Sequence, residues 1–145
     1  MTQQIFSRSE VCKILKITTN KLFRIEFSNS INPLYTRKHH TSYFDFDKLV
    51  SVNLFIQTNK VVGFTNVVEI FKTLKNLEVD KNPTEKFVIF EDRSVWLKDI
   101  PNRLDELMNL EILAYFTWNE IIHSTQTKLI EAGYNLPLTT LERVS

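Results

Sequence analysis

Glycine is scarce in this sequence, with two residues in 145, and proline occurs only four times. Long flexible linkers and glycine-rich phosphate loops are therefore excluded, because both need several glycines. The single cysteine, Cys12, rules out an internal disulfide and fits a reducing compartment. No apolar run approaches the roughly 18 residues that a membrane span requires. We therefore expect a cytoplasmic protein that binds no nucleotide cofactor through such a loop.

Charge is distributed unevenly along the chain, although the formal net charge is only +1. Residues 1–60 contain nine Lys and Arg against four Asp and Glu, which gives a formal charge of +5. Residues 61–145 contain nine Lys and Arg against thirteen Asp and Glu, which gives −4. A basic segment joined to an acidic one indicates a polyanion-binding module attached to a part with another role.

The beginning of the chain predicts two short helices in succession. Ser7 and Glu10 have the spacing of a capping box, in which each side chain bonds the backbone N–H of the other residue. Thr18 is a plausible N-cap for a second helix that runs from Thr19 to about Glu26. The apolar residues that fall at helical spacing and should face inward are Val11, Ile14 and Leu15, then Leu22 and Ile25. Two short helices joined by three or four residues are typical of a helix-turn-helix.

A basic hairpin and a third helix are predicted to follow. Pro33 prevents the second helix from continuing. Residues 34–36 and 43–44 are short apolar segments on either side of the basic turn 37–42, which is typical of a hairpin with a cationic tip. Asp45 is expected to cap a helix that reaches about Gln57. The aromatic residues Tyr43, Phe44 and Phe46 are expected to pack the hairpin against the helices rather than stack on bases.

The second half of the chain shows mixed periodicity. Its predicted elements are a helix capped by Thr65 or Asn66, a hairpin of residues 87–90 and 95–97, a helix after Pro101, and a last helix after a capping box at Thr117 and Glu120. Residues 110–116 are compatible with strand or helix. Gly133 is expected to end the last helix, Ile130 to face inward and Trp118 to be exposed. The fold class is therefore α+β and mostly helical, with one hairpin in this segment.

The order of the first elements resembles the winged helix-turn-helix of MerR-like regulators, a superfamily that includes phage excisionases. The residues that carry the resemblance are residues 7–18 (SRSEVCKILKIT), Leu22, Ile31, Pro33, Tyr43, Phe44 and Asp45. Lys16 stands where that family usually has a glycine, and the long dimerisation helix of standard MerR regulators is missing. The resemblance covers about 40% of the chain and implies a DNA-binding domain over residues 1–62. Residues 63–145 would then form an α+β domain for dimerisation or partner binding.

The resemblance also implies which residues would contact DNA. The second helix enters the major groove in such proteins, and the wing reaches the flanking backbone or the minor groove. By position, the candidates on the helix are Thr19, Asn20, Lys21 and Arg24, and those on the wing are Arg37, Lys38, His39 and His40. Lysine and arginine neutralise phosphates, whereas asparagine can pair with adenine and arginine with guanine.

Catalytic and metal-binding patterns are weak by comparison. Glu91, Asp92 and Lys98 faintly resemble a metal-dependent nuclease, but Trp96 stands where such a site needs a carboxylate. His39 and His40 have no further metal ligand nearby, and Cys12 and His123 are distant in sequence. We expect no enzyme activity, no metal and no cofactor.

The expected function is sequence-specific binding of double-stranded DNA by a homodimer, either a transcriptional regulator or an excisionase-like architectural factor of a phage or mobile element. The alternative is a phage- or antitoxin-type adaptor that uses the winged helix as a scaffold for protein contacts. The acidic second half and an exposed Trp118 would favour that alternative.

Overall fold

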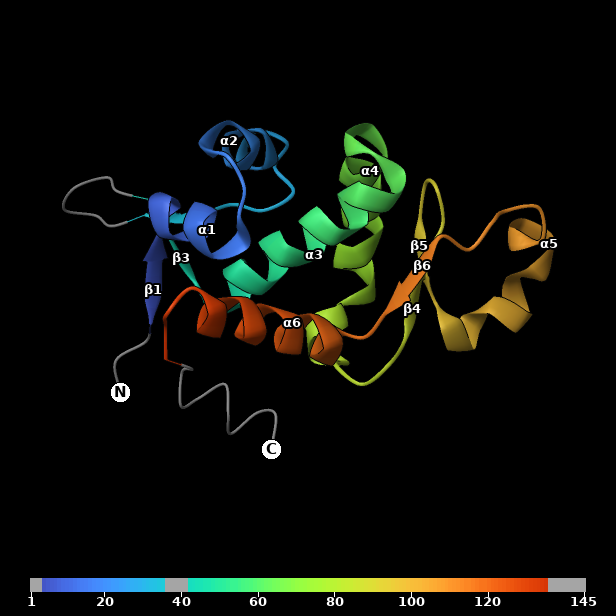
Figure 1. Ribbon diagram of the computed structural model, residues 1–145. Coiled ribbons are helices and arrows are strands. Elements are labelled where there is room, and N and C mark those ends of the chain that lie inside the picture. The colour runs from blue at the N-terminus through green and yellow to red at the C-terminus, as the bar shows by residue number, and fades with distance from the viewer. Residues whose placement is uncertain (1–3, 36–41, 136–145) are drawn as a thin grey trace. The chain divides into compact units, whose positions relative to one another are not determined.

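The computed structural model describes residues 4–35 and 42–135, and the chain divides into two compact units. Unit 1 consists of Met1–Asn53 and Ile122–Ser145, and unit 2 consists of Leu54–Ile121. The described residues form an α+β fold, mostly helical with two small antiparallel sheets, which confirms the predicted class (Figure 1). The division into functional domains at residues 1–62 and 63–145 stays a prediction.

Unit 1 begins with a short strand that the sequence patterns do not indicate. Its elements are β1 (Ile5–Ser7), α1 (Arg8–Leu15), α2 (Thr19–Phe27), β2 (Leu34–Tyr35) and β3 (Ser42–Asp45), followed by the first part of α3 (Phe46–Val62) and most of α6 (Trp118–Glu131). Strand β3 pairs antiparallel with both β1 and β2, so the sheet order is β1-β3-β2. In Figure 1, β1 and β3 run side by side next to α1.

The core of unit 1 combines the helix positions that the helical spacing predicts with one phenylalanine from each of β1 and β3. Its fully buried side chains include Phe6, Val11, Ile14, Leu22, Ile25, Phe44, Leu49 and Val50. Asp45 caps α3 as expected, because its carboxylate accepts the Lys48 N–H at 2.8 Å. A buried bond from Asn53 Nδ2 to Thr125 Oγ1, 2.9 Å long, ties α3 to α6 within this unit.

Unit 2 is built around the second sheet, with order β5-β4-β6. Its elements are α4 (Phe64–Leu77), the 3₁₀ helix η1 (Val79–Lys81), β4 (Phe87–Ile89), β5 (Ser94–Trp96), the 3₁₀ helix η2 (Leu97–Arg103), α5 (Leu104–Leu107) and β6 (Ala114–Phe116). Side chains alternate between the faces of a strand. On β5, Ser94 bonds Thr73 of α4, and the next residue, Val95, packs with Leu107 of α5. The sheet therefore lies between α4 and α5 (Figure 1).

Several local expectations for the second half are corrected by the structure. Helix α4 starts at Phe64 after Gly63, whose φ is +84°, and neither Thr65 nor Asn66 is its cap. Trp118 is buried, with 6% of its surface exposed, whereas Ile130 is 57% exposed. The apolar hairpin was predicted correctly, and the ambiguous segment before Thr117 ends in strand β6.

Candidate nucleic-acid interface

The start of α1 is held by a reciprocal pair of bonds. The Ser7 hydroxyl accepts the Glu10 N–H at 3.1 Å, and the Glu10 carboxylate accepts the Ser7 N–H at 3.1 Å. The predicted capping box is thus confirmed. Tyr134, which follows α6, donates its hydroxyl to the same carboxylate at 2.8 Å. The Ser7 N–H, helped by Tyr134, lowers the pKa of Glu10 below its ordinary value, because both donors stabilise the charged form.

The turn between α1 and α2 is fixed by two further caps. Lys16 adopts the left-handed conformation (φ 57°, ψ 49°), and its N–H donates to the carbonyl of Cys12. A left-handed residue at this place usually is glycine, so Lys16 carries a conformational cost in order to end α1 sharply. Thr18 Oγ1 then accepts the Lys21 N–H at 3.1 Å and starts α2, as predicted. The direction of α2 is therefore set by local bonds on both sides of a three-residue turn.

Helix α2 has an inner and an outer side. Leu22 and Ile25 are fully buried. With a rotation of about 100° per residue, the positions opposite these two are Asn20, Arg24 and Phe27. All three of those residues are exposed. The helix thus presents an amide, a guanidinium and an aromatic ring on one side.

The exposed aromatic ring belongs to a feature that sequence reasoning missed. Phe27 is the last residue of α2 rather than part of a loop, and 82% of its surface is exposed. Its ring stacks on Phe23, with ring centres 6.3 Å apart and planes at 28°. These two rings line a shallow, open hollow of about 540 Å³ together with Asn20 and Arg24. We call these four residues the outer face of α2. The spacing of four between the two phenylalanines, away from Leu22 and Ile25, was the available clue.

The acidic residue of α2 is paired with an arginine of α1. Glu26 accepts two bonds from Arg8 of α1, from Nε at 3.1 Å and from Nη2 at 2.7 Å. The Glu26 side chain is only 8% exposed. The Arg8 guanidinium also lies 4.9 Å from the centre of the Phe23 ring. The only carboxylate of α2 is thus neutralised by a partner on the neighbouring helix, and it does not oppose an anion on the outer face.

The structure separates the predicted contact residues into three groups. Asn20 and Arg24 come together on the outer face of α2, whereas Thr19 and Lys21 lie on its flanks, with Lys21 half-buried. The predicted wing residues Arg37, Lys38, His39 and His40 lie outside the described residues. Next to that segment, Phe44 and Phe46 are buried, so the expected packing role is confirmed for these two rings.

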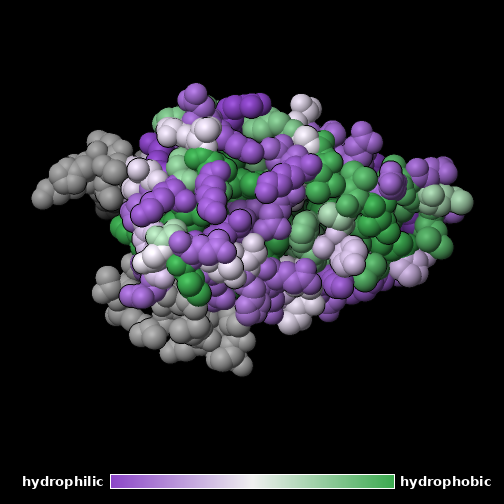
Figure 2. Space-filling view, in the orientation of Figure 1, coloured by the Kyte–Doolittle hydropathy of each residue, from purple (hydrophilic) through white to green (hydrophobic). Residues whose placement is uncertain are grey.

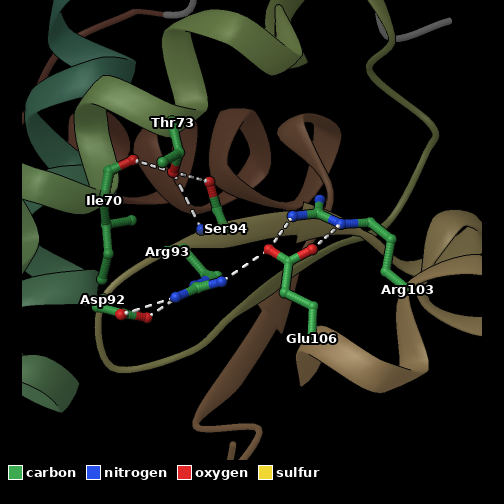
Figure 3. Close-up of polar contacts among 7 residues, drawn as sticks. All are labelled: Ile70, Thr73, Asp92, Arg93, Ser94, Arg103 and Glu106. Carbon is green, nitrogen blue, oxygen red and sulfur yellow. Dashed lines mark hydrogen bonds and ion pairs between the residues drawn. The ribbon is translucent and has the colours of Figure 1, made fainter. Parts of the chain in front are cut away.

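Unit 2 also carries arginines, but they belong to a network with carboxylates (Figure 3). Arg93 reaches Asp92 at 3.0 Å and Glu106 at 2.7 Å, and Arg103 donates to the same Glu106 carboxylate at 2.9 Å. The bonds from Arg103 and then Arg93 lower the pKa of Glu106. We call these four residues the Glu106 cluster. The positive and negative side chains of the cluster pair with each other, and their bonds connect the β4–β5 turn to η2 and α5. We therefore interpret the cluster as structural.

A second exposed surface of unit 2 is apolar. Figure 2 shows hydrophobic side chains gathered over the region of unit 2 that carries its sheet and α5. The large exposed hydrophobic residues there are Leu97, Leu104, Met108, Ile112 and Tyr115. Exposed apolar patches of this kind are common at protein-interaction sites.

The described part of the chain was compared with the arrangements that metal binding and thiol chemistry require. Within residues 4–35 and 42–135, no three His, Cys, Asp or Glu side chains are grouped as metal ligands. Burial raises the pKa of the Cys12 thiol, which disfavours the reactive thiolate. Across the same described ranges, no helix combines the length and the apolar character needed to cross a membrane.

Comparison with known proteins adds no family assignment. No model of a known protein family matches the chain, and no protein of curated function matches it in sequence. The resemblance to MerR-like and excisionase-like domains therefore stays a prediction.

Proposed function

We propose that this protein binds double-stranded DNA sequence-specifically, with α2 as the helix that enters the major groove. The observation that carries the proposal is the outer face of α2, where Asn20 and Arg24 stand together above the buried Leu22 and Ile25. In the major groove, an asparagine amide can pair with adenine and an arginine guanidinium with guanine. A short helix supported by a preceding helix is the element that helix-turn-helix proteins insert there.

The charge around α2 supports the same reading. Lys13 on α1 and Lys16 in the turn between α1 and α2 are exposed, and Lys21 lies on the flank of α2. Glu26 is engaged by Arg8 and does not weaken this positive surface. Cations at the edges of a groove-binding helix contact phosphates and supply the part of the affinity that is independent of sequence.

In this proposal, β2 and β3 form the wing of a MerR-like or excisionase-like winged helix-turn-helix. Arg37, Lys38, His39 and His40 would contact the flanking phosphates or the minor groove. The protein would act as a transcriptional regulator or an architectural factor. A homodimer is part of the proposal, because one small module makes few base contacts and two copies read paired half-sites.

The test is a fluorescence anisotropy titration of the full chain against a pool of random-sequence duplexes at two salt concentrations. Phosphate contacts by Lys21, Arg37 and Lys38 would give the affinity a salt exponent of about −2.7, hence a loss of about 40-fold between roughly 50 and 200 mM salt. The double variant Lys21→Ala/Arg24→Ala should lose affinity and part of the salt dependence. The absence of salt-sensitive binding by the unaltered protein would reject the proposal.

A matched control comes from unit 2. Lys72 and Arg103 both belong to exposed ion pairs, with Glu69 and Glu106 respectively. The variant Lys72→Ala/Arg103→Ala removes the same number of positive charges from the chain. It should leave the affinity close to that of the unaltered protein, because only charges near α2 are expected to contact phosphates. An equal loss in both double variants would mean that overall charge, and not α2, determines binding.

The second candidate function is a protein-interaction adaptor, and a specific observation favours it. Leu104, Met108, Ile112 and Tyr115 expose apolar surface in unit 2, whereas Trp118, which was expected to be exposed, is buried. Co-purification with a partner in stoichiometric amounts, lost in Met108→Asp, would support this function. Both functions are compatible, because they use different surfaces.

A further inference from the structure

Phe27 is exposed, yet its ring is held in place by a chain of contacts. Its ring stacks on Phe23, the Phe23 ring faces the Arg8 guanidinium at 4.9 Å, and Arg8 is fixed by two bonds to Glu26. A single exposed apolar residue needs no explanation in general. The Phe27 ring contacts Phe23, and Phe23 is in turn held by the cation–π contact of Arg8, so the exposed ring is arranged in advance for contact. Such preorganisation lowers the entropic cost of binding.

The ring stands in line with the two polar side chains of the outer face. With a rise of 1.5 Å per residue, the stretch from Asn20 to Phe27 measures about 10 Å along the helix axis. At about 3.4 Å per base pair, this length corresponds to roughly three base pairs. Asn20, Arg24 and Phe27 are therefore spaced so that each can meet a different base pair of one site.

The chemistry of the hollow indicates what the ring would meet. The 5-methyl group of thymine is the apolar group that a base pair presents in the major groove, and phenylalanine is one of the side chains that contact it. The hollow is lined by Phe23 and Phe27 with Asn20 and Arg24 beside them, so an apolar contact and hydrogen bonds to bases are available together.

The charge around this face favours DNA over a protein as the occupant. The hollow is also too open to enclose a small ligand. The nearby Lys16 and Lys21 match the phosphates of a duplex.

We propose that Phe27, supported by Phe23, reads the methyl group of a thymine in the major groove and so makes the protein select sites with a thymine at one defined position. This inference rests on the proposed function, because it requires that α2 enters the groove. Phe27 is then a residue that determines specificity and adds little to the general affinity for DNA.

The experiment has two stages and uses the full chain. First, bound duplexes are enriched from a random pool by the unaltered protein and by Phe27→Ala. The preference for thymine at one position should disappear in Phe27→Ala, while the other positions keep their preferences. Second, that thymine is replaced by deoxyuridine, which removes only the methyl group. The unaltered protein should lose about fourfold in affinity, the effect of one buried methyl-sized group, and Phe27→Ala should lose none.

Two controls separate the possible failures. Tyr115→Ala removes an exposed aromatic ring from unit 2 and should leave the thymine preference unchanged, and Phe27→Leu should keep part of it. If the protein binds duplexes in a salt-dependent manner but deoxyuridine has no effect at any thymine, the inference is wrong and the proposed function stands. If no duplex binds at all, the proposed function is wrong and the inference falls with it.

Discussion

The outer face of α2 and the Glu106 cluster both display arginine on the surface, but they differ in how carboxylates are arranged around it. In the Glu106 cluster, Glu106 lies between Arg93 and Arg103 and accepts bonds from both. On α2, the carboxylate of Glu26 is bound by Arg8 of the neighbouring helix α1. A count of positive residues alone would favour the Glu106 cluster, which contains Arg93 and Arg103, whereas the outer face contains only Arg24. The two regions therefore differ in where their carboxylates lie: Glu106 binds both arginines of its cluster, whereas Glu26 binds an arginine of the neighbouring helix α1.

The largest effect is expected when the support beneath the outer face is removed. Leu22→Ala deletes a fully buried side chain and should lower the free energy of unfolding by about 2–5 kcal/mol. Phe27→Ala, on the same helix, should change it by less than about 0.5 kcal/mol, because the ring is mostly exposed. Urea denaturation of both variants checks the contrast. Equal losses would mean that Phe27 is part of the core and not a contact residue.

A somewhat smaller effect is expected from the ion pairs of the two regions. Glu26→Gln weakens a nearly buried pair with Arg8 and should reduce stability by about 1.5–3 kcal/mol, as for hydrogen bonds between charged groups. Glu106→Gln should have no measurable effect on stability, because water screens its exposed pairs. Thermal unfolding of both variants tests this prediction. If Glu106→Gln proved the more damaging, the comparison between the two regions would be reversed.

The effect on DNA binding should distinguish base reading from phosphate contact. Arg24→Ala should reduce discrimination between preferred and random duplexes by about 1–3 kcal/mol if Arg24 reads a base. Lys21→Ala should weaken binding to all duplexes alike and lower the salt exponent by about one. Titrations against both kinds of duplex give the two quantities. A uniform loss in Arg24→Ala would assign this arginine to phosphate contact.

The sequence predicted those features that depend on interactions between residues close together in the chain. The caps by Ser7, Thr18 and Asp45 were predicted because they depend on residues three positions apart. The burial of Leu22 and Ile25 followed from helical spacing, since a short amphipathic helix has one inner side.

Apart from the cap of α4, where Gly63 stands instead of Thr65 or Asn66, most failures concern contacts between distant segments. Strand β1 exists only because β3 pairs with it from nearly forty residues away. Trp118 was expected to be exposed, but the surrounding tertiary structure buries it. At the candidate site, Asn20 and Arg24 were predicted. The role of Phe27 was missed, because it depends on where α2 ends and on the contact of Arg8 with Phe23.

The smallest predicted effect is the change in the stabilising contribution of Glu10 at low pH. The pKa of Glu10 is lowered from 4.5 by the Ser7 N–H, so its contribution to stability is present above pH 4.5 and is lost as pH falls through the lowered value. Glu10→Gln should be less stable than the unaltered protein by less than about 1 kcal/mol at neutral pH, and the difference should shrink in acid. Urea denaturation across this pH range measures it. If the difference in stability between the two proteins stayed constant with pH, the lowered pKa of Glu10 would not be the source of this stabilisation.

The central claim, that the outer face of α2 contacts DNA, is tested most directly by NMR. Backbone and side-chain resonances of the labelled full chain are recorded while a duplex from the enriched pool is added at low salt. The account predicts that the largest shifts occur at Asn20, Phe23, Arg24 and Phe27, with little change at Asp92, Arg93, Arg103 and Glu106. Shifts concentrated in unit 2, or none on α2 while the duplex binds, would contradict it.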